Sequence, residues 1–285
     1  MSFFDKPKFD PLRILFENKP LDDFCGMTSN EIRHILYSPF DDVSPLKINS
    51  PIDNDTLNNI PFFRLTEMLL KIVQREGSIK LTPLGALPKN VLHELYEYKF
   101  IPEFLIEAGV STLNREHDVI SIMTAHNAAR ISGILKKVKG NLLLTKSGLM
   151  LLNPEKRTDF FLRVLKSYTT EFNWACNDGY ADFPIGQFGW GFTIFLLYNF
   201  GDTKQTKQFY ADKFLKAFPN FIHMMSLREF STPEKDYADC YILRSFERFA
   251  EWFGFAEDCK KDFFHKNNDI VIRKNTLMKV FRFEI

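Results

Sequence analysis

The sequence has few cysteines, and they are not clustered. The four are Cys25, Cys176, Cys240 and Cys259, and no two of them form a C-x-x-C pair. Closely spaced cysteines are the usual sign of a structural zinc site, and many cysteines in a short chain indicate a disulfide scaffold. The pattern argues against both and favours reduced thiols in a cytoplasmic protein.

Metal-binding patterns are also missing. None of the six histidines stands in an H-x-x-x-H or H-x-H spacing, which would place two imidazoles side by side. Asp53-Asn54-Asp55 begins like a calcium loop, but the glycine at the sixth position and the glutamate at the twelfth are absent. The sequence predicts no metal site.

The sequence has no phosphate-binding loop and no apolar run long enough to cross a bilayer. Neither G-x-x-x-x-G-K-S/T nor G-x-G-x-x-G occurs, so no nucleotide cofactor is expected. The most apolar segment, Phe188–Phe200, is shorter than the stretch of about 20 residues that a spanning helix needs. Residues 1–16 carry acids and prolines where a secretory signal needs an unbroken apolar stretch. We expect neither a membrane contact nor an export signal.

Neither sign of charge is in excess. The chain has 37 Lys and Arg against 36 Asp and Glu, a formal net charge of +1. The field of the whole molecule therefore does not attract a polyanion, and a nucleic-acid site would have to be local. What is abundant is phenylalanine, with 31 residues, in a chain that is 45% hydrophobic. Phe fills cores and interfaces and supplies no reactive group, so this composition favours contact surfaces over catalysis.

Helical spacing of apolar residues dominates the chain and predicts a mainly α fold with a minor β component. Thr28 and Glu31 fit a capping box for a helix over 31–37. The spacing predicts further helices over 61–73, from 88 until Pro102, over 117–123 and 127–134, from 147, and over 157–172, 188–200, 203–219 and 231–255. Short strands are expected at 79–81, 135–138, 142–144 and 270–272, with a hairpin turn at Lys139-Gly140-Asn141.

One phrase occurs three times. GNLLLTKSGLMLL at 140–152 resembles GSIKLTPLGAL at 77–87 and, more distantly, NDIVIRKNTLMKVF at 268–281. A helix, a short hairpin with a glycine turn, a Thr or basic residue, a small residue and another helix is typical of winged-helix-like units. The matching positions, Thr82, Thr145 and Arg273, stand 63 and 128 residues apart, which favours an internal repeat. We expect this pattern to serve packing and topology rather than nucleic-acid contact.

The repeat and the composition suggest three parts. Residues 1–27 are expected to form an irregular N-terminal segment, residues 28–154 a helical domain with two winged-helix-like units, and residues 155–285 a helical domain ending in a third hairpin-like unit. The alternative is that the two domains share one core and form one continuous body.

Several segments together carry a resemblance. MTSNEIRHILYSPF, IKLTPLGALPKNVLHEL, NLLLTKSGLMLL, FNWACNDGY and FYADKFLKAFP resemble a family of uncharacterised bacterial proteins, some of whose relatives are labelled plasmid open-reading-frame (ORF-three-like) proteins. The likeness extends from about Thr28 to Phe281. It implies no established activity and no catalytic residues.

The densest group of polar and aromatic residues lies in FNWACNDGYADFPIGQFGW, residues 172–190. Its candidate binding residues are Trp174, Asn177, Asp178, Tyr180, Asp182, Gln187 and Trp190. Asp178 and Asp182 would form a pair of carboxylates, and Cys176 would be a nucleophile, if this loop were an active site. The run Asn-Asp-Gly is also typical of an ordinary turn, and a structural turn packed by tryptophans is the favoured interpretation.

A local basic cluster surrounds the second phrase. The candidate nucleic-acid contacts are Arg130, Lys136, Lys137, Lys139 and Lys146. Phosphate contact requires such a cluster, although the preceding helical segment offers only Arg130 as a strong reader of bases. A solvated lysine face is therefore favoured. A second cluster comprises Lys260, Lys261, His265, Lys266, Arg273 and Lys274.

These observations favour a non-enzymatic binding or regulatory module that acts through a protein partner. The first alternative is a nucleic-acid-binding winged-helix protein, and the second is an enzyme with its site in the loop at 172–190. The sequence leaves the partner and the oligomeric state open.

Overall fold

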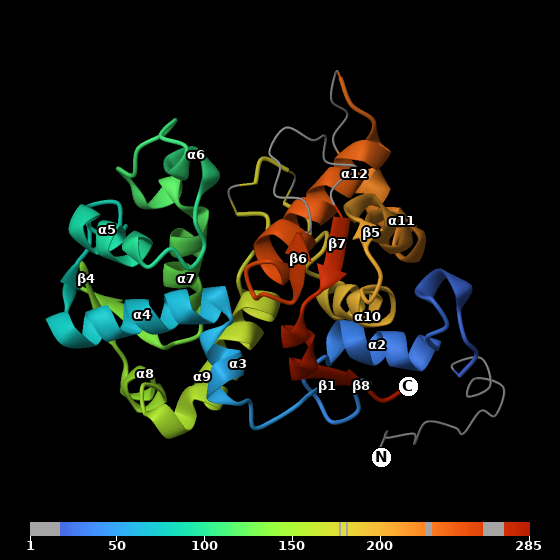
Figure 1. Cartoon of the computed structure of the whole chain (residues 1–285), viewed down its shortest axis with the longest axis horizontal. Helices are drawn as coiled ribbons and strands as arrows, with labels where there is room; N and C mark the ends of the chain where they lie inside the picture. Colours follow the sequence, from blue (N-terminus) through green and yellow to red (C-terminus); the bar gives the residue numbers. More distant parts are fainter. Residues whose placement is uncertain (1–17, 177, 181, 226–229, 259–270) are drawn as a thin grey trace, which may run out of the picture.

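The computed structural model describes residues 18–258 and 271–285, apart from 177, 181 and 226–229. Within these residues the protein is mainly α-helical, with antiparallel sheets of two or three strands, as the helical periodicity predicts. Figure 1 shows two groups of elements side by side, with the helix α9 (Arg157–Lys166) between them.

The first group contains a three-stranded sheet with helices packed against it. Its elements in chain order are α4 (Pro61–Glu76), β2 (Ile79–Lys80), α5 (Lys89–Glu97), α6 (Phe104–Glu107), η2 (Glu116–Asp118), α7 (Ile120–Ile131), β3 (Leu135–Val138), β4 (Asn141–Leu144) and α8 (Lys146–Leu151). The last strand in sequence lies in the middle of the sheet, in the order β2-β4-β3. The predicted helices at 117–123 and 127–134 are largely one helix, α7, because the intervening Thr124, Ala125 and His126 are buried and continue its packed face.

The hairpin between β3 and β4 has the predicted turn. Val138 pairs with Asn141, which leaves Lys139 and Gly140 as a two-residue loop. Both have positive φ, 48° and 79°. Two-residue hairpin loops favour this conformation because its twist matches that of the strands, and glycine adopts it without strain.

The second group repeats this succession of elements. It consists of α10 (Trp190–Phe200), β5 (Gln205–Thr206), α11 (Lys207–Ala217), η5 (Pro219–Met224), α12 (Pro233–Ile242), the π-helical η6 (Leu243–Ala250), β6 (Ala256–Asp258), β7 (Val271–Lys274) and η8 (Thr276–Val280). Here too the last strand lies in the middle, in the order β5-β7-β6. Both sheets are antiparallel.

The sheet pairing shows that the three similar phrases do not form the three separate hairpin units that the sequence predicts. Ile79 pairs with Leu142, so the phrases at 77–87 and 140–152 contribute neighbouring strands to one sheet, where two separate hairpin units were expected. The third phrase supplies β7, which occupies the middle position that β4 occupies in the first sheet. The strands β4 and β7, from phrases about 128 residues apart, thus each lie in the middle of a sheet, whereas β2 and β4, from phrases 63 residues apart, pair within one sheet.

The N-terminal elements pack with the second group. They are η1 (Asp22–Phe24), α2 (Ser29–Tyr37), β1 (Leu46–Ile48) and α3 (Asn54–Asn58), and α2 begins with the predicted capping box. The strand β1 pairs with β8 (Phe281–Phe283) at the opposite end of the chain. The helix α2 lies against α10 so closely that a Cβ on Gly191 would stand 2.8 Å from Cγ2 of Ile35. These contacts favour one continuous body, and the domain boundaries stay a prediction.

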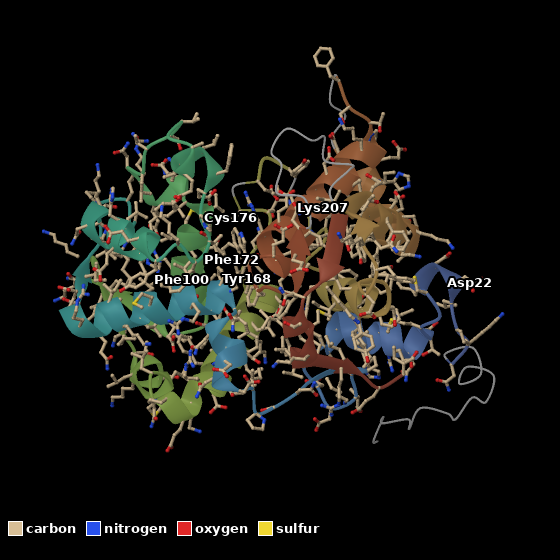
Figure 2. The ribbon with its side chains drawn as sticks, in the orientation of Figure 1. Asp22, Phe100, Tyr168, Phe172, Cys176 and Lys207 are labelled. Carbon is tan, nitrogen blue, oxygen red and sulfur yellow. The ribbon has the colours of Figure 1, made fainter. Side chains whose placement is uncertain are left out.

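Aromatic side chains join the two groups. The rings of Phe62 on α4 and Trp252 after η6 stack with centroids 5.7 Å apart, and the Phe62 amide donates to the Trp252 carbonyl. The helix α9 follows the short η3 (Pro154–Lys156) and continues as the π-helical η4 (Ser167–Glu171). Tyr168 of η4 packs on Phe253, with ring centroids 5.1 Å apart. Figure 2 shows Tyr168 and Phe172 in this central region. The abundant Phe residues therefore form the seam as well as the two interiors.

No helix in the part of the chain that the structure describes is long and apolar enough to cross a membrane. The apolar segment at 188–200 instead forms the buried helix α10, as predicted.

Candidate functional site

The basic residues predicted around the hairpin lie together on one surface. We call the five residues Arg130, Lys136, Lys137, Lys139 and Lys146 the hairpin surface. The four lysines are exposed, and Arg130 is partly exposed at the end of α7. Among the described residues none of the five forms a salt bridge, whereas basic residues such as Arg75, Arg157 and Lys207 do. Their positive charge is not neutralised locally.

A shallow depression adjoins these side chains. It has a volume of about 560 Å³ and is lined by Asn127, Arg130, Ile131, Gly133, Leu135, Lys136, Lys137 and Thr145. It lies between the end of α7 and β3, so three residues of the hairpin surface converge on it. An open depression with basic walls suits the binding of an anionic group.

Packing at the base of the hairpin fixes these lysines in place. Leu135 and Leu142 are buried, while the neighbouring positions on β3 face solvent. The Thr145 hydroxyl accepts from the Gly148 amide at 2.9 Å and donates to the Gly133 carbonyl at 2.8 Å. Thr145 thus caps α8 and ties its start to the turn after α7.

The loop at 172–190 is held by internal contacts. Trp174 and Trp190 are each 3% exposed. The Trp174 indole donates to the Tyr168 carbonyl at 2.8 Å, and its amide donates to the Gln187 side chain at 3.1 Å. The Gln187 amide group in turn donates to the Phe172 carbonyl at 2.6 Å. These contacts are those of a packed turn.

The two carboxylates of this loop have different partners. Asp178 forms an ion pair with Arg244 at 2.5 Å, and both side chains are fully buried. Asp182 is exposed and accepts from the Asn173 side chain at 2.7 Å. The Tyr180 amide donates to Asp178 at 2.9 Å. The candidate Asn177 lies outside the described residues, and the binding or catalytic role of the loop stays a hypothesis.

The Cys176 carbonyl in the same loop accepts from Arg248 at 3.1 Å. Within the described residues Cys25, Cys176 and Cys240 form no disulfide, and Cys259 lies outside those residues. Within the described ranges no group of three or more His, Cys, Asp or Glu side chains is placed to hold a metal ion.

The second basic cluster is only partly described. Lys260, Lys261, His265 and Lys266 lie outside the described residues. Lys274 at the end of β7 forms a salt bridge with Asp202 at 2.8 Å. Its charge is therefore compensated, in contrast to the charges of the hairpin surface.

Sequence reasoning did not anticipate a second depression, of about 550 Å³, between α9 and β1. Basic and acidic side chains line it, including Lys47, Asp159 and Arg282. Arg282 pairs with Glu284 at 3.0 Å, and Asp159 pairs with Lys156 at 3.0 Å. Its walls come from segments more than 100 residues apart, so no local pattern in the sequence marks it.

The family profile of the Y4jL N-terminal domain matches residues 58–158. The matched segment runs from the end of α3 to the start of α9 and includes the whole hairpin surface. The match supports the resemblance to an uncharacterised family over this part of the chain, while the likeness to plasmid open-reading-frame proteins stays a prediction. Comparisons with curated proteins and with solved structures found no match.

Proposed function

We propose that the protein is a non-enzymatic binding protein that contacts nucleic acid through the hairpin surface. The observation that carries this proposal is that, within the described part of the chain, none of five neighbouring basic side chains forms a salt bridge, in a chain of net charge +1. A nucleic-acid ligand neutralises such charges with its phosphates and releases counterions as it binds. For these two reasons we rank nucleic-acid binding above binding to a protein partner, the function that composition alone favoured.

The topology supports the proposal. The order α4, β2, α5, α7, β3, β4 with β4 in the middle of the sheet is that of a winged-helix unit. In this interpretation the β3–β4 hairpin is the wing, and the second group of elements is a second such unit, related by an internal repeat of about 128 residues.

Fluorescence anisotropy of a labelled duplex at about 50 and 200 mM salt tests the proposal. The test variant carries Lys136→Glu, Lys137→Glu and Lys139→Glu. The matched control carries Lys19→Glu, Lys204→Glu and Lys235→Glu, three exposed lysines elsewhere, so that net charge changes equally. We expect the test variant to lose at least tenfold in affinity at low salt and the control to lose much less. Equal losses, or no binding by the unaltered protein, would refute the proposal.

A protein partner is the second candidate function. The segment around α6 exposes four apolar side chains, Tyr98 at 46%, Phe104 at 40%, Leu105 at 54% and Val110 at 72%. Neighbouring exposed apolar residues favour a protein contact, because burying them on association is favourable. Partner capture that Leu105→Lys abolishes and the hairpin variant preserves would support this function.

A further inference from the structure

We infer that the nucleic acid is bound through its sugar-phosphate backbone, without base reading by α7, and therefore independently of sequence. This inference rests on the proposed function and narrows its ligand class. It follows from the burial of α7 and from the kinds of side chain on the hairpin surface.

In helix-turn-helix proteins the recognition helix lies in the major groove and its N-terminal residues contact base edges. The helix α7 has this position in the first unit, since it follows α5 and directly precedes the hairpin. Most of its side chains face the interior, however, and only the stripe of Ile120, Met123, Asn127, Arg130 and Ile131 is partly or fully exposed. The buried residues of α7 are each exposed by no more than 2%, and they are Ser121, Ile122, Thr124, Ala125, His126, Ala128 and Ala129.

The following segment of the chain covers α7. The Ser167 hydroxyl in η4 donates to the Ala128 carbonyl at 3.1 Å, and Arg163 on α9 donates to the Ser132 carbonyl at 3.1 Å. Both donors come from the connection between the two groups, which Figure 1 shows running through the centre. This connection covers the buried side of α7, so nucleic acid can approach the helix only along the stripe of Ile120, Met123, Asn127, Arg130 and Ile131.

The interior side of α7 is fixed as well. Nδ1 of His126 lies 2.7 Å from Glu116, with both side chains buried, and Glu116 also accepts from the Leu87 amide at 2.8 Å. Detaching α7 would separate His126 from Glu116 and break a buried hydrogen-bond network, which is unfavourable. Local rearrangement on binding is therefore unfavourable.

What remains accessible suits phosphate contact. Of α7, Asn127, Arg130 and Ile131 reach the depression beside Lys136 and Lys137. Four of the five residues of the hairpin surface are lysines, which act as point charges. Base reading relies on bidentate contacts from Arg, Asn or Gln. Asn127 and Arg130 are the accessible side chains of α7 that could make such contacts, while Ile120, Met123 and Ile131 are apolar. Lysines therefore dominate the accessible set, which binds charge and carries little sequence information.

Selection from a random pool of duplexes of about 20 base pairs, followed by sequencing of the bound fraction, tests the inference at low salt. We expect no enriched motif, and affinities within about threefold for AT-rich and GC-rich duplexes of equal length. Asn127→Ala should change all these affinities by a similar small factor. An enriched motif bound at least tenfold more tightly, whose preference Asn127→Ala removes, would overturn the inference and leave the proposed function intact.

Amide hydrogen exchange supplies a second measurement. The amides of residues 121–129 should stay protected when a saturating duplex is added, because α7 remains covered by η4. Loss of protection there on binding would show that α7 is released and would overturn the inference. Failure of every duplex to bind would instead reject the proposed function itself.

Discussion

Single residues at the base of the hairpin and in the loop at 172–190 are fixed by close contacts. Gly148, the second glycine of the phrase at 140–152, has no room for a side chain: a Cβ there would lie 2.3 Å from the Ile134 carbonyl oxygen. The glycine therefore lets α8 start directly against the end of α7 and the start of β3. The repeated phrase has a small residue at this position, and the structure identifies the carbonyl that Gly148 approaches.

Gly148→Ala should destabilise the protein by about 1 to 3 kcal/mol, because the backbone must shift to accommodate the methyl group. Urea denaturation followed by circular dichroism measures this. Ser147→Ala, one position earlier on the same helix, is the control and should cost less than about 0.5 kcal/mol. Equal stability of Gly148→Ala and the unaltered protein would contradict the close approach.

Asp178→Ala should destabilise the protein by about 3 to 5 kcal/mol, because it removes a buried carboxylate that pairs with the buried Arg244. Asp182→Ala, in the same loop but exposed, should cost less than about 1 kcal/mol. Both are measured by the shift of the urea midpoint. Similar midpoints for the two variants would argue against a structural role for Asp178.

Capping residues show how far local sequence reasoning extends. The box at Thr28 and Glu31 is confirmed, since the Thr28 amide donates to Glu31 at 2.7 Å. At α12 the spacing of Ser231 and Glu234 fits a capping box, but Thr232 caps the helix instead. Ser231 instead donates to the buried Asp236, a contact that depends on packing.

At the scale of elements, local patterns predicted most helices and the β3–β4 hairpin. They did not predict the partner of β2, because Ile79 and Leu142 are brought together by the intervening helices. They also split α7, because its buried polar residues interrupt the apolar spacing although Glu116 compensates His126. Long-range contacts of this kind leave no periodic signal in the sequence.

Gly140→Ala should destabilise the hairpin by about 1 kcal/mol, because alanine is strained at the positive φ of this turn. A loosened turn no longer holds Lys137 and Lys139 in one arrangement, so duplex affinity should fall as well. Gly109→Ala is the control, since Gly109 has a similar φ of 70° in a distant loop. It should cost similar stability without changing affinity. Unchanged affinity for Gly140→Ala would argue against a preformed hairpin surface.

At the scale of the whole molecule, one hydrophobic cluster extends through both groups of elements, and the Phe62–Trp252 contact joins them. The strands β1 and β8 connect the N-terminal elements to the C-terminal end of the chain. The sequence left the choice between two domains and one body open, because contacts between the groups join residues far apart in the chain. Net charge, in contrast, is readable from composition, and it predicts that any nucleic-acid site is a local cluster.

Unfolding in urea should be a single transition that tryptophan fluorescence and circular dichroism report at the same midpoint, because the shared core makes the two groups cooperative. The tryptophans lie in the loop at 172–190 and in the second group, at Trp174, Trp190 and Trp252. Tryptophan fluorescence therefore reports on the loop and the second group. Circular dichroism follows both groups. Separate midpoints would show that the groups unfold independently.

The central claim is that the hairpin surface contacts phosphates, and the salt dependence of duplex binding tests it most directly. The measured quantity is the slope of the logarithm of the binding constant against the logarithm of salt concentration. For the Lys136/Lys137/Lys139→Glu variant this slope should be less steep by about 2 to 3, because each lysine that contacts a phosphate contributes about 0.9. The Lys19/Lys204/Lys235→Glu control should keep the original slope. Identical slopes for the unaltered protein and the hairpin variant would contradict the claim.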